Sequence, residues 1–186
     1  MIALLAVGVL LWTLSHYFKR LMPERRARLG EPGKGLVALG IVASIVLMVI
    51  GYRGADFITV WNTPGWTVHL NNVLMILALW VYGSSAAKGG KVWPANNIRH
   101  PQLTGFKIWA AAQLLGNGDL ASVVLFGGLL AWAVGEVILI NRAEPAWAPP
   151  GNADKAAHIR LAVITLVLYA IIAGLHVWLG VWPFPS

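Results

Sequence analysis

The chain has 186 residues, of which 58% are hydrophobic and 11% are charged. Typical globular proteins contain roughly 45–50% apolar and about 25% charged residues, so this composition favours a membrane protein. It excludes an intrinsically disordered chain, and the absence of cysteine excludes a disulfide framework or a thiolate metal site. The net charge of +7 is compatible with nucleic-acid binding, which makes the positions of Lys and Arg informative.

Apolar runs predict five helices long enough to cross the hydrocarbon core of a membrane, which takes roughly 17–25 residues. They cover residues 1–18, 35–52, 68–87, 120–140 and 161–182. A sixth run, residues 104–116, is shorter and contains Lys107. Its length alone fits a core helix, a half-helix or a re-entrant segment.

The distribution of Lys and Arg indicates that the short run also crosses. If it does, all of the 14 Lys and Arg except Arg53 lie on one side of the membrane. Otherwise the last group, Arg142, Lys155 and Arg160, moves to the opposite side. Because cytoplasmic loops carry the excess of these residues, we predict an all-α bundle of six transmembrane helices, the fourth short, with cytoplasmic basic loops and both termini outside. The charge then reflects topology and contact with anionic lipid headgroups, and not a nucleic-acid partner.

Three local patterns predict boundaries and a contact face. The turn at residues 117–119 ends in Asp119, which is placed to cap the following helix. Residues 146–151, which follow one proline and contain two more, predict an extended loop. A stripe of small residues on the fifth span predicts close approach of a neighbouring helix. Its members are Gly127, Ala131 and Gly135.

The five histidines are candidate functional residues, because polar side chains are costly inside a membrane. Neutral imidazole is a common axial ligand of haem iron, and helical bundles can hold a haem between facing helices. The inner candidates, by depth, are His16, His100 and His158, and the outer ones are His69 and His176. For each of them the alternative is an interfacial or loop histidine without a ligand.

Glu136 is the only acid deep within one of these long runs. We expect it to form an ion pair that fixes helix packing, rather than to relay protons. The candidate partners are Arg99, Lys107 and Arg142. Further polar residues, expected to form hydrogen bonds between helices, are Asn71, Asn72 and Gln113. The sequence contains no zinc motif, phosphate-binding loop or serine-nucleophile turn.

One block of the sequence resembles the signature of the NnrU family. It runs from Arg99-His100-Pro101-Gln102 through Gly105 and Trp109 to residues 117–122, Asn-Gly-Asp-Leu-Ala-Ser, and residues 125–128, Leu-Phe-Gly-Gly. The first span is similar as well, since Ser15 and His16 followed by Arg20 resemble the histidine-containing first helix of the family. The layout of the spans extends the resemblance over most of the chain, which implies a single NnrU-like transmembrane domain over residues 1–186.

The resemblance implies a protein of the bacterial inner membrane that is associated with denitrification and with nitric oxide reductase expression or activity. Because the family is related to haem-binding zeta-carotene isomerase, it also implies haem b as the cofactor, with His16 as an iron ligand. A second histidine of the family is replaced by Gln113, a poor ligand for haem iron. The second ligand is then His100 or His69, or the iron is five-coordinate, or haem is absent.

We favour His16 with His100 as the ligands of the haem iron, because both are predicted on the cytoplasmic side. The full set of cofactor-site candidates is His16, His100, Arg99, Gln113 and His69.

Alternative functions stay open, so the sequence does not decide whether the protein is an enzyme. The same relationship implies a haem-dependent carotenoid cis–trans isomerase. Membrane methyltransferases also use an Arg-His-Pro element at the membrane interface, but they add a Glu-Glu pair, whereas Glu136 and Glu144 are separated in this sequence. A noncatalytic assembly role with another membrane protein would use the small-residue stripe as its contact face.

Overall fold

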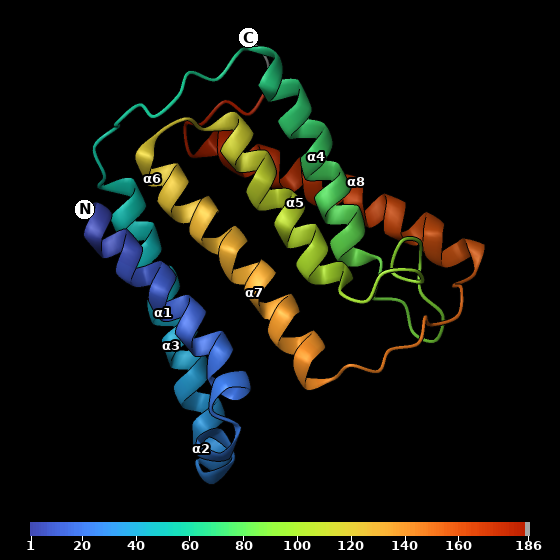
Figure 1. The fold of residues 1–186 in the computed structure, drawn as a ribbon. Helices are drawn as coiled ribbons and strands as arrows, with labels where there is room; N and C mark the ends of the chain where they lie inside the picture. Colours follow the sequence, from blue (N-terminus) through green and yellow to red (C-terminus); the bar gives the residue numbers. More distant parts are fainter. Residues whose placement is uncertain (185–186) are drawn as a thin grey trace. The chain divides into compact units, whose positions relative to one another are not determined.

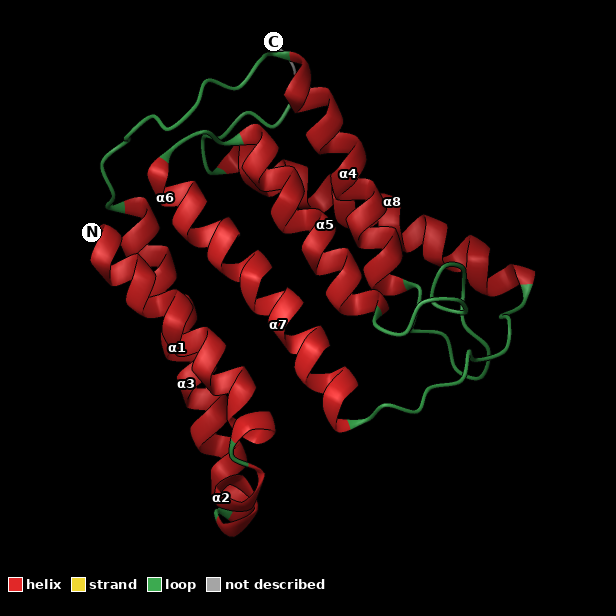
Figure 2. Cartoon of the chain, in the orientation of Figure 1, coloured by secondary structure: helices red, strands yellow, loops and turns green. Residues whose placement is uncertain are grey.

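The computed structural model describes residues 1–184, which form helices joined by loops, with no strand in that range (Figures 1 and 2). The elements are α1 (Ile2–Leu21), α2 (Pro23–Arg28), α3 (Gly30–Arg53), α4 (Trp66–Gly83), α5 (Pro101–Gly116), α6 (Leu120–Ser122), the π-helical turn η1 (Val123–Gly127), α7 (Gly128–Ala143) and α8 (Lys155–Trp178). Among the described residues, five stretches are long and apolar enough to cross a membrane: Ile2–Leu21, Gly30–Arg53, Trp66–Gly83, Leu120–Ala143 and Lys155–Trp178. The predicted all-α, multi-pass membrane bundle is confirmed.

The helices form two compact units. The first consists of residues 1–62 and 117–145, and it contains α1, α2, α3, α6, η1 and α7. The second consists of residues 63–116 and the chain from Ala146 onward, and it contains α4, α5 and α8. Our expectation of one transmembrane domain over residues 1–186 stays a prediction.

In the first unit, α1 and α3 pack as an antiparallel hairpin (Figure 1). A Cβ atom at Gly51 would lie 2.5 Å from the backbone nitrogen of Leu5, and one at Gly8 would lie 2.8 Å from that of Met48. Any side chain at these two positions would push the helix backbones apart, so glycine sets how closely the hairpin closes.

The helix α7 runs parallel to α1 within the same unit. Gly128, at the start of α7, packs against Val9, and Gly135 packs against the hydroxyl of Tyr17 further along α1. Both helices therefore lead from one end of the unit to the same opposite end.

The predicted small-residue stripe is only partly the contact face. A Cβ atom at Gly127 would meet no other atom within 4 Å, and Ala131 is exposed. Gly135 makes the expected close contact with α1. The second glycine of α7 that contacts α1 is Gly128, which was not part of the predicted stripe. The physical reason is the π-helical turn η1, because its wider turn changes which residues share a face before and after it.

The turn before α6 confirms the predicted cap. Asp119 accepts a hydrogen bond from the Ser122 N–H at 3.0 Å and another from the Ser122 hydroxyl at 2.5 Å. Because the Ser122 hydroxyl donates its hydrogen bond to Asp119, it acts as the acceptor toward the Tyr52 hydroxyl, which lies at 2.9 Å. The same turn is linked to the segment after α3, because the Val60 N–H donates to the Gly118 carbonyl at 2.7 Å.

In the second unit, α4 and α5 are antiparallel. A Cβ atom at Gly105, near the start of α5, would lie 2.7 Å from the backbone nitrogen of Tyr82, near the end of α4. At the opposite end of the pair, Gly116 faces Asn71. The two helices therefore run alongside each other over almost their whole length.

The helix α8 begins earlier than expected, at Lys155, because the Asp154 carboxylate accepts a hydrogen bond from the Ala157 N–H at 2.7 Å. It ends at Trp178 instead of residue 182, and Gly180 follows with a φ of 82°. This left-handed backbone is typical of residues that follow a helix end.

The path of the chain shows that α5 recrosses the thickness that α4 spans. Within the second unit, α5 runs antiparallel to α4 along almost its whole length. Within the first unit, the Leu120 N–H at the start of α6 donates to the carbonyl of Ile58, in the loop after α3, at 2.9 Å. The fourth crossing is short, because its 16 residues span about 24 Å at 1.5 Å per residue, less than a hydrocarbon core of about 30 Å.

We predict that Gly105→Ala lowers the free energy of unfolding in detergent by about 1–3 kcal/mol, because the new Cβ would collide with backbone atoms of α4. Gly174→Ala is the matched control, since a Cβ there meets nothing within 4 Å and alanine favours helix. Unfolding would be followed by far-ultraviolet circular dichroism during titration with a denaturing detergent. Equal stability of the two variants would contradict the close approach.

Candidate functional site

In the first unit, His16 of α1 lies between aromatic side chains of two helices. The His16 Nδ1 is 2.8 Å from the carbonyl oxygen of Trp12, one helical turn earlier. The imidazole ring also lies 4.2 Å from the Trp12 ring and 4.8 Å from the Trp132 ring of α7, measured between ring centroids. The two indoles therefore flank the imidazole from two helices.

The hydrogen bond of His16 determines which of its nitrogens has a free lone pair. A carbonyl oxygen only accepts, so Nδ1 carries the proton in the neutral ring. The lone pair is then on Nε2, which is the atom that binds a metal or accepts a further hydrogen bond. In the neutral ring, this hydrogen bond therefore selects the tautomer that leaves Nε2 open to iron.

This bond alone does not distinguish His16. His158 makes the same bond to the Asp154 carbonyl and His176 makes it to the Ile172 carbonyl, each at 2.8 Å. His176 is exposed, however, whereas His16 is half-buried between aromatic rings. Enclosure by the two indoles is therefore the distinguishing feature.

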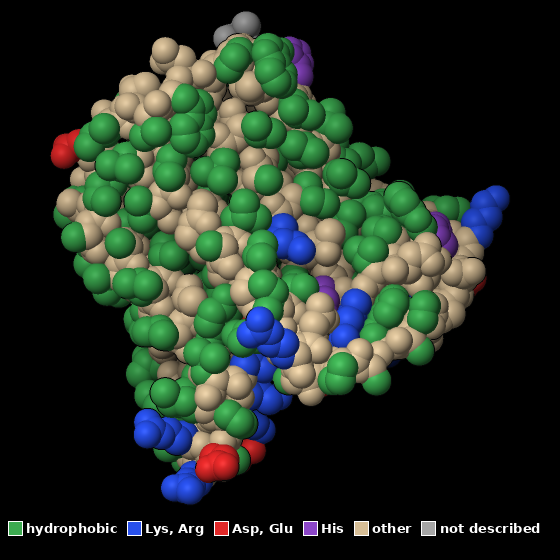
Figure 3. Space-filling view, in the orientation of Figure 1, with side chains coloured by type: hydrophobic (Ala, Val, Ile, Leu, Met, Phe, Trp, Pro, Cys, Tyr) green, Lys and Arg blue, Asp and Glu red, His purple; other side chains and the backbone are tan. Residues whose placement is uncertain are grey.

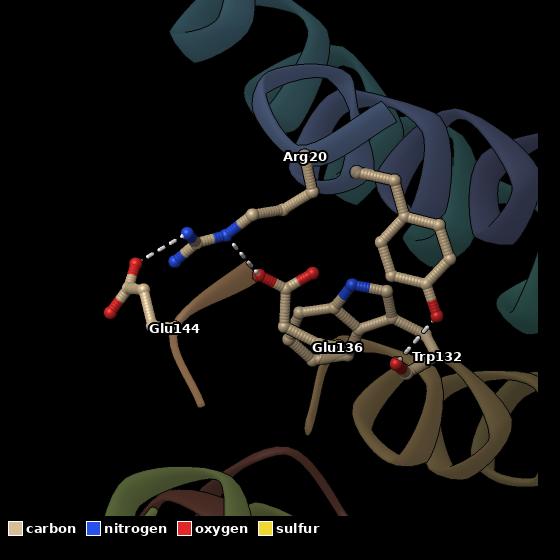
Figure 4. Close-up of polar contacts among 5 residues, drawn as sticks. Arg20, Trp132, Glu136 and Glu144 are labelled. Carbon is tan, nitrogen blue, oxygen red and sulfur yellow. Dashed lines mark hydrogen bonds and ion pairs between the residues drawn. The ribbon is translucent and has the colours of Figure 1, made fainter. Parts of the chain in front are cut away.

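A charged cluster joins α1 to α7 one turn beyond His16 (Figure 4). The Arg20 Nε lies 3.8 Å from a carboxylate oxygen of Glu136, and another guanidinium nitrogen of Arg20 lies 2.8 Å from Glu144. Beside them, the Tyr17 hydroxyl donates to the Trp132 carbonyl at 2.8 Å. These contacts hold the end of α1 against α7, and so position His16 beside Trp132.

The expected ion pair of Glu136 exists, but its partner is Arg20 and not one of the three cations expected. Arg20 was missed because α1 and α7 are far apart in the sequence, and no local pattern indicates that they are neighbours. The one sequence feature that pointed to Arg20 was its place after His16 in the first span.

Trp12 Nε1 and Glu136 Oε2 are buried polar atoms of this cluster that have no hydrogen-bond partner among residues 1–184. A buried polar atom without a partner costs about 1–3 kcal/mol, so the site is suited to a further polar group. The Trp12 indole N–H is a donor of the kind that binds a carboxylate such as a haem propionate, and His16 Nε2 is an atom of the kind that binds iron. The Arg20 guanidinium is already shared by Glu136 and Glu144, and the Glu136 oxygen calls for a donor.

The other site candidates, His100, Arg99, Gln113 and His69, belong to the second unit. His100 precedes α5, and its carbonyl accepts a hydrogen bond from the Thr104 N–H at 2.8 Å. The Gln113 side-chain nitrogen donates to the Met75 sulfur of α4 at 3.5 Å, which confirms the expected interhelical bond. His69 is exposed on α4, whereas His100 and Arg99 are half-buried.

Within residues 1–184, no three His, Asp or Glu side chains come together as a metal-binding group. The site around His16 instead contains one imidazole ring between two indoles. Next to it, one arginine is shared by two carboxylates. Together with the apolar helices, this defines a multi-pass membrane protein with a polar, histidine-containing site in its first helical unit.

The chain matches the family model described as NnrU protein over residues 4–183, and it belongs to this family. No curated protein and no solved structure gives a significant match. The resemblance noted in the block from Arg99 to Gly128 is thereby confirmed.

We predict that Arg20→Ala lowers the free energy of unfolding by about 1–3 kcal/mol, because it leaves Glu136 with its carboxylate buried and without its cation. Adding Glu136→Gln should recover part of this loss. Arg28→Ala is the control, since its exposed pair with Glu24 contributes about 0–1 kcal/mol. If both arginine variants lose equal stability, the ion pair has no special role.

Proposed function

We propose that this NnrU-family protein binds haem b through His16 and acts in bacterial denitrification, by supporting the expression or activity of nitric oxide reductase. The observation that carries the proposal is the His16 ring, held between Trp12 and Trp132 with its lone pair on Nε2. Family membership supports the general class.

We propose His100 as the second iron ligand, on the sequence-derived topology alone. Gln113, where the family has a histidine, is the poorer choice because a carboxamide is a weak ligand for haem iron. A five-coordinate iron held by His16 is the alternative, and His69 is disfavoured by its exposure.

A bound haem b would supply an iron for one-electron transfer or for binding a small diatomic molecule. The protein's own part is then to hold and orient it. Trp12 and Trp132 limit the rotation of the His16 ring and exclude water from one side of it. Arg20 is paired with both Glu136 and Glu144, so its part is to hold the end of α1 against α7 and thereby keep His16 in place.

For localisation, we propose the bacterial inner membrane with basic loops in the cytoplasm and both termini outside. Support comes from the first unit, where Lys and Arg gather at the end that contains α2 while hydrophobic side chains cover most of its length (Figure 3). An excess of Lys and Arg is typical of the cytoplasmic side.

This orientation predicts opposite labelling of two single-cysteine variants, and the absence of native cysteine makes the experiment direct. Asp56→Cys, in the exposed loop after α3, should react with a membrane-impermeant maleimide in spheroplasts. Glu24→Cys, exposed in α2, should react only after the membrane is opened. Labelling of Glu24→Cys but not of Asp56→Cys in spheroplasts would contradict this orientation and indicate the opposite one.

We predict that the wild-type protein, purified in mild detergent from haem-replete cells, shows a Soret band. His16→Ala should lose most of it, because the proposed ligand is removed. His176→Ala is the matched control, since that residue makes the same backbone bond but is exposed. His100→Ala should retain haem and change from a six-coordinate to a five-coordinate spectrum. A haem-free wild type, or a full Soret band in His16→Ala, would refute haem binding at His16.

The physiological part is tested in a deletion strain grown without oxygen on nitrate. It should accumulate nitric oxide, and wild-type protein but not His16→Ala should restore its consumption. Reductase transcript and reductase activity, measured in the same cells, separate an effect on expression from one on activity. Normal nitric oxide consumption in the deletion strain would contradict the proposed role.

A further inference from the structure

The second unit contains a cleft of about 710 Å³ that shares no lining residue with the His16 site of the first unit. It is bordered by the end of α4 with the loop after it, and by the beginning of α8 with the loop before it. Six of its lining residues are Gly83, Lys88, Val92, Asn152, Arg160 and Ile164.

Backbone hydrogen bonds between the two loops form one wall of the cleft. The Lys91 N–H donates to the Gly151 carbonyl at 2.6 Å, and the Ala153 N–H donates back to the Lys91 carbonyl at 2.9 Å. Gly90 allows this approach, because a side chain there would collide with the backbone of Asn152. These contacts hold the two loops together along this wall of the cleft.

The cleft has a cationic part and an apolar part. Lys88 and Arg160 contribute the positive charges, and both are exposed. Neither has a carboxylate within ion-pair distance among residues 1–184. The apolar part includes Leu161, which is buried against Val92.

The remaining charged groups leave the cleft net positive. Asp154 is the one acid that lines it, and one of its carboxylate oxygens caps α8 through the Ala157 N–H. Lys91 lies beside the cleft, with its ammonium donating to two carbonyls of the loop after α4. Lys155 lies next to Asp154 in sequence and adds a further positive charge.

The position of the cleft along α8 indicates what would fill it. Arg160 and Ile164 are one helical turn apart, and Ile164 lies within the span Lys155–Trp178 that is apolar enough to cross a membrane. The exposed side chain of Ile164 continues the apolar surface of that helix outward. A ligand seated here meets cations at the helix end and apolar surface one turn deeper, which is the polarity profile of a phospholipid.

We propose that this cleft binds the headgroup of an anionic phospholipid, with the phosphate contacting Lys88 and Arg160 and an acyl chain lying along Ile164. Basic clefts between helices at a membrane surface bind such headgroups, and this volume is typical of small-molecule sites. The site is independent of haem, since none of its residues belongs to the His16 cluster.

The test is native mass spectrometry of the full-length protein in detergent, with phosphatidylglycerol or phosphatidylcholine added. Wild type should retain phosphatidylglycerol in preference to phosphatidylcholine. Lys88→Gln with Arg160→Gln should weaken phosphatidylglycerol binding by roughly tenfold or more, as expected for two charges near the lipid phosphate. The Soret band should not change, so failure of this proposal is distinct from failure of haem binding.

The control variant, Arg25→Gln with Arg28→Gln, removes two exposed charges from the first unit and should leave this binding unchanged. Lys88→Arg with Arg160→Lys keeps both charges and should bind as wild type does. An equal loss of phosphatidylglycerol binding in the control variant would show that the lipid is held by general surface charge and not by this cleft. Competition by millimolar inorganic phosphate would identify a site for soluble phosphate and overturn the lipid assignment.

Discussion

Close approach of helix backbones at glycine is the constraint on which both helical units depend. In a bilayer the lipid tails are as apolar as the side chains, so hydrophobic burial does not drive helices together. Short-range packing has to do so, and it is strongest where no side chain intervenes. Gly51 against Leu5 closes the α1–α3 hairpin, and Gly105 against Tyr82 closes the α4–α5 pair. The outward faces are then left for lipid.

This packing makes the charges around His16 tolerable. Arg20 and Glu136 are largely buried near the end of a membrane span, where a single ion would be costly. Parallel packing of α1 and α7 brings them together, and Glu144 shares the guanidinium from a more exposed position. The charged cluster consequently fixes one end of α1 and keeps the His16 ring against the indoles.

The sequence predicted features that depend on local chemistry. Hydropathy located the helices, and the short side chain of Asp119 beside Gly118 predicted the cap before α6. It did not predict Arg20 as the partner of Glu136, because that contact depends on which helices are neighbours. The α7 contact face was assigned from a constant α-helical spacing, and the π-helical turn η1 breaks that spacing. The assignment of the lone pair to His16 Nε2 follows from the hydrogen bond at Nδ1. That bond depends on the rotamer of the side chain, which no sequence pattern predicts.

The short helix α5 connects the topology with the polar chemistry of the fold. It carries Lys107 and Gln113, which an isolated helix could not place in lipid without a large penalty. Only Gln102 and Leu115 within it are exposed, in contrast to the long α8, most of which is exposed. Protein thus shields α5, and the bond from Gln113 to Met75 satisfies one of its polar groups. A helix shielded in this way does not need the length of a lipid-facing span, which explains how the part of the motif block at residues 101–109 can lie on the short α5.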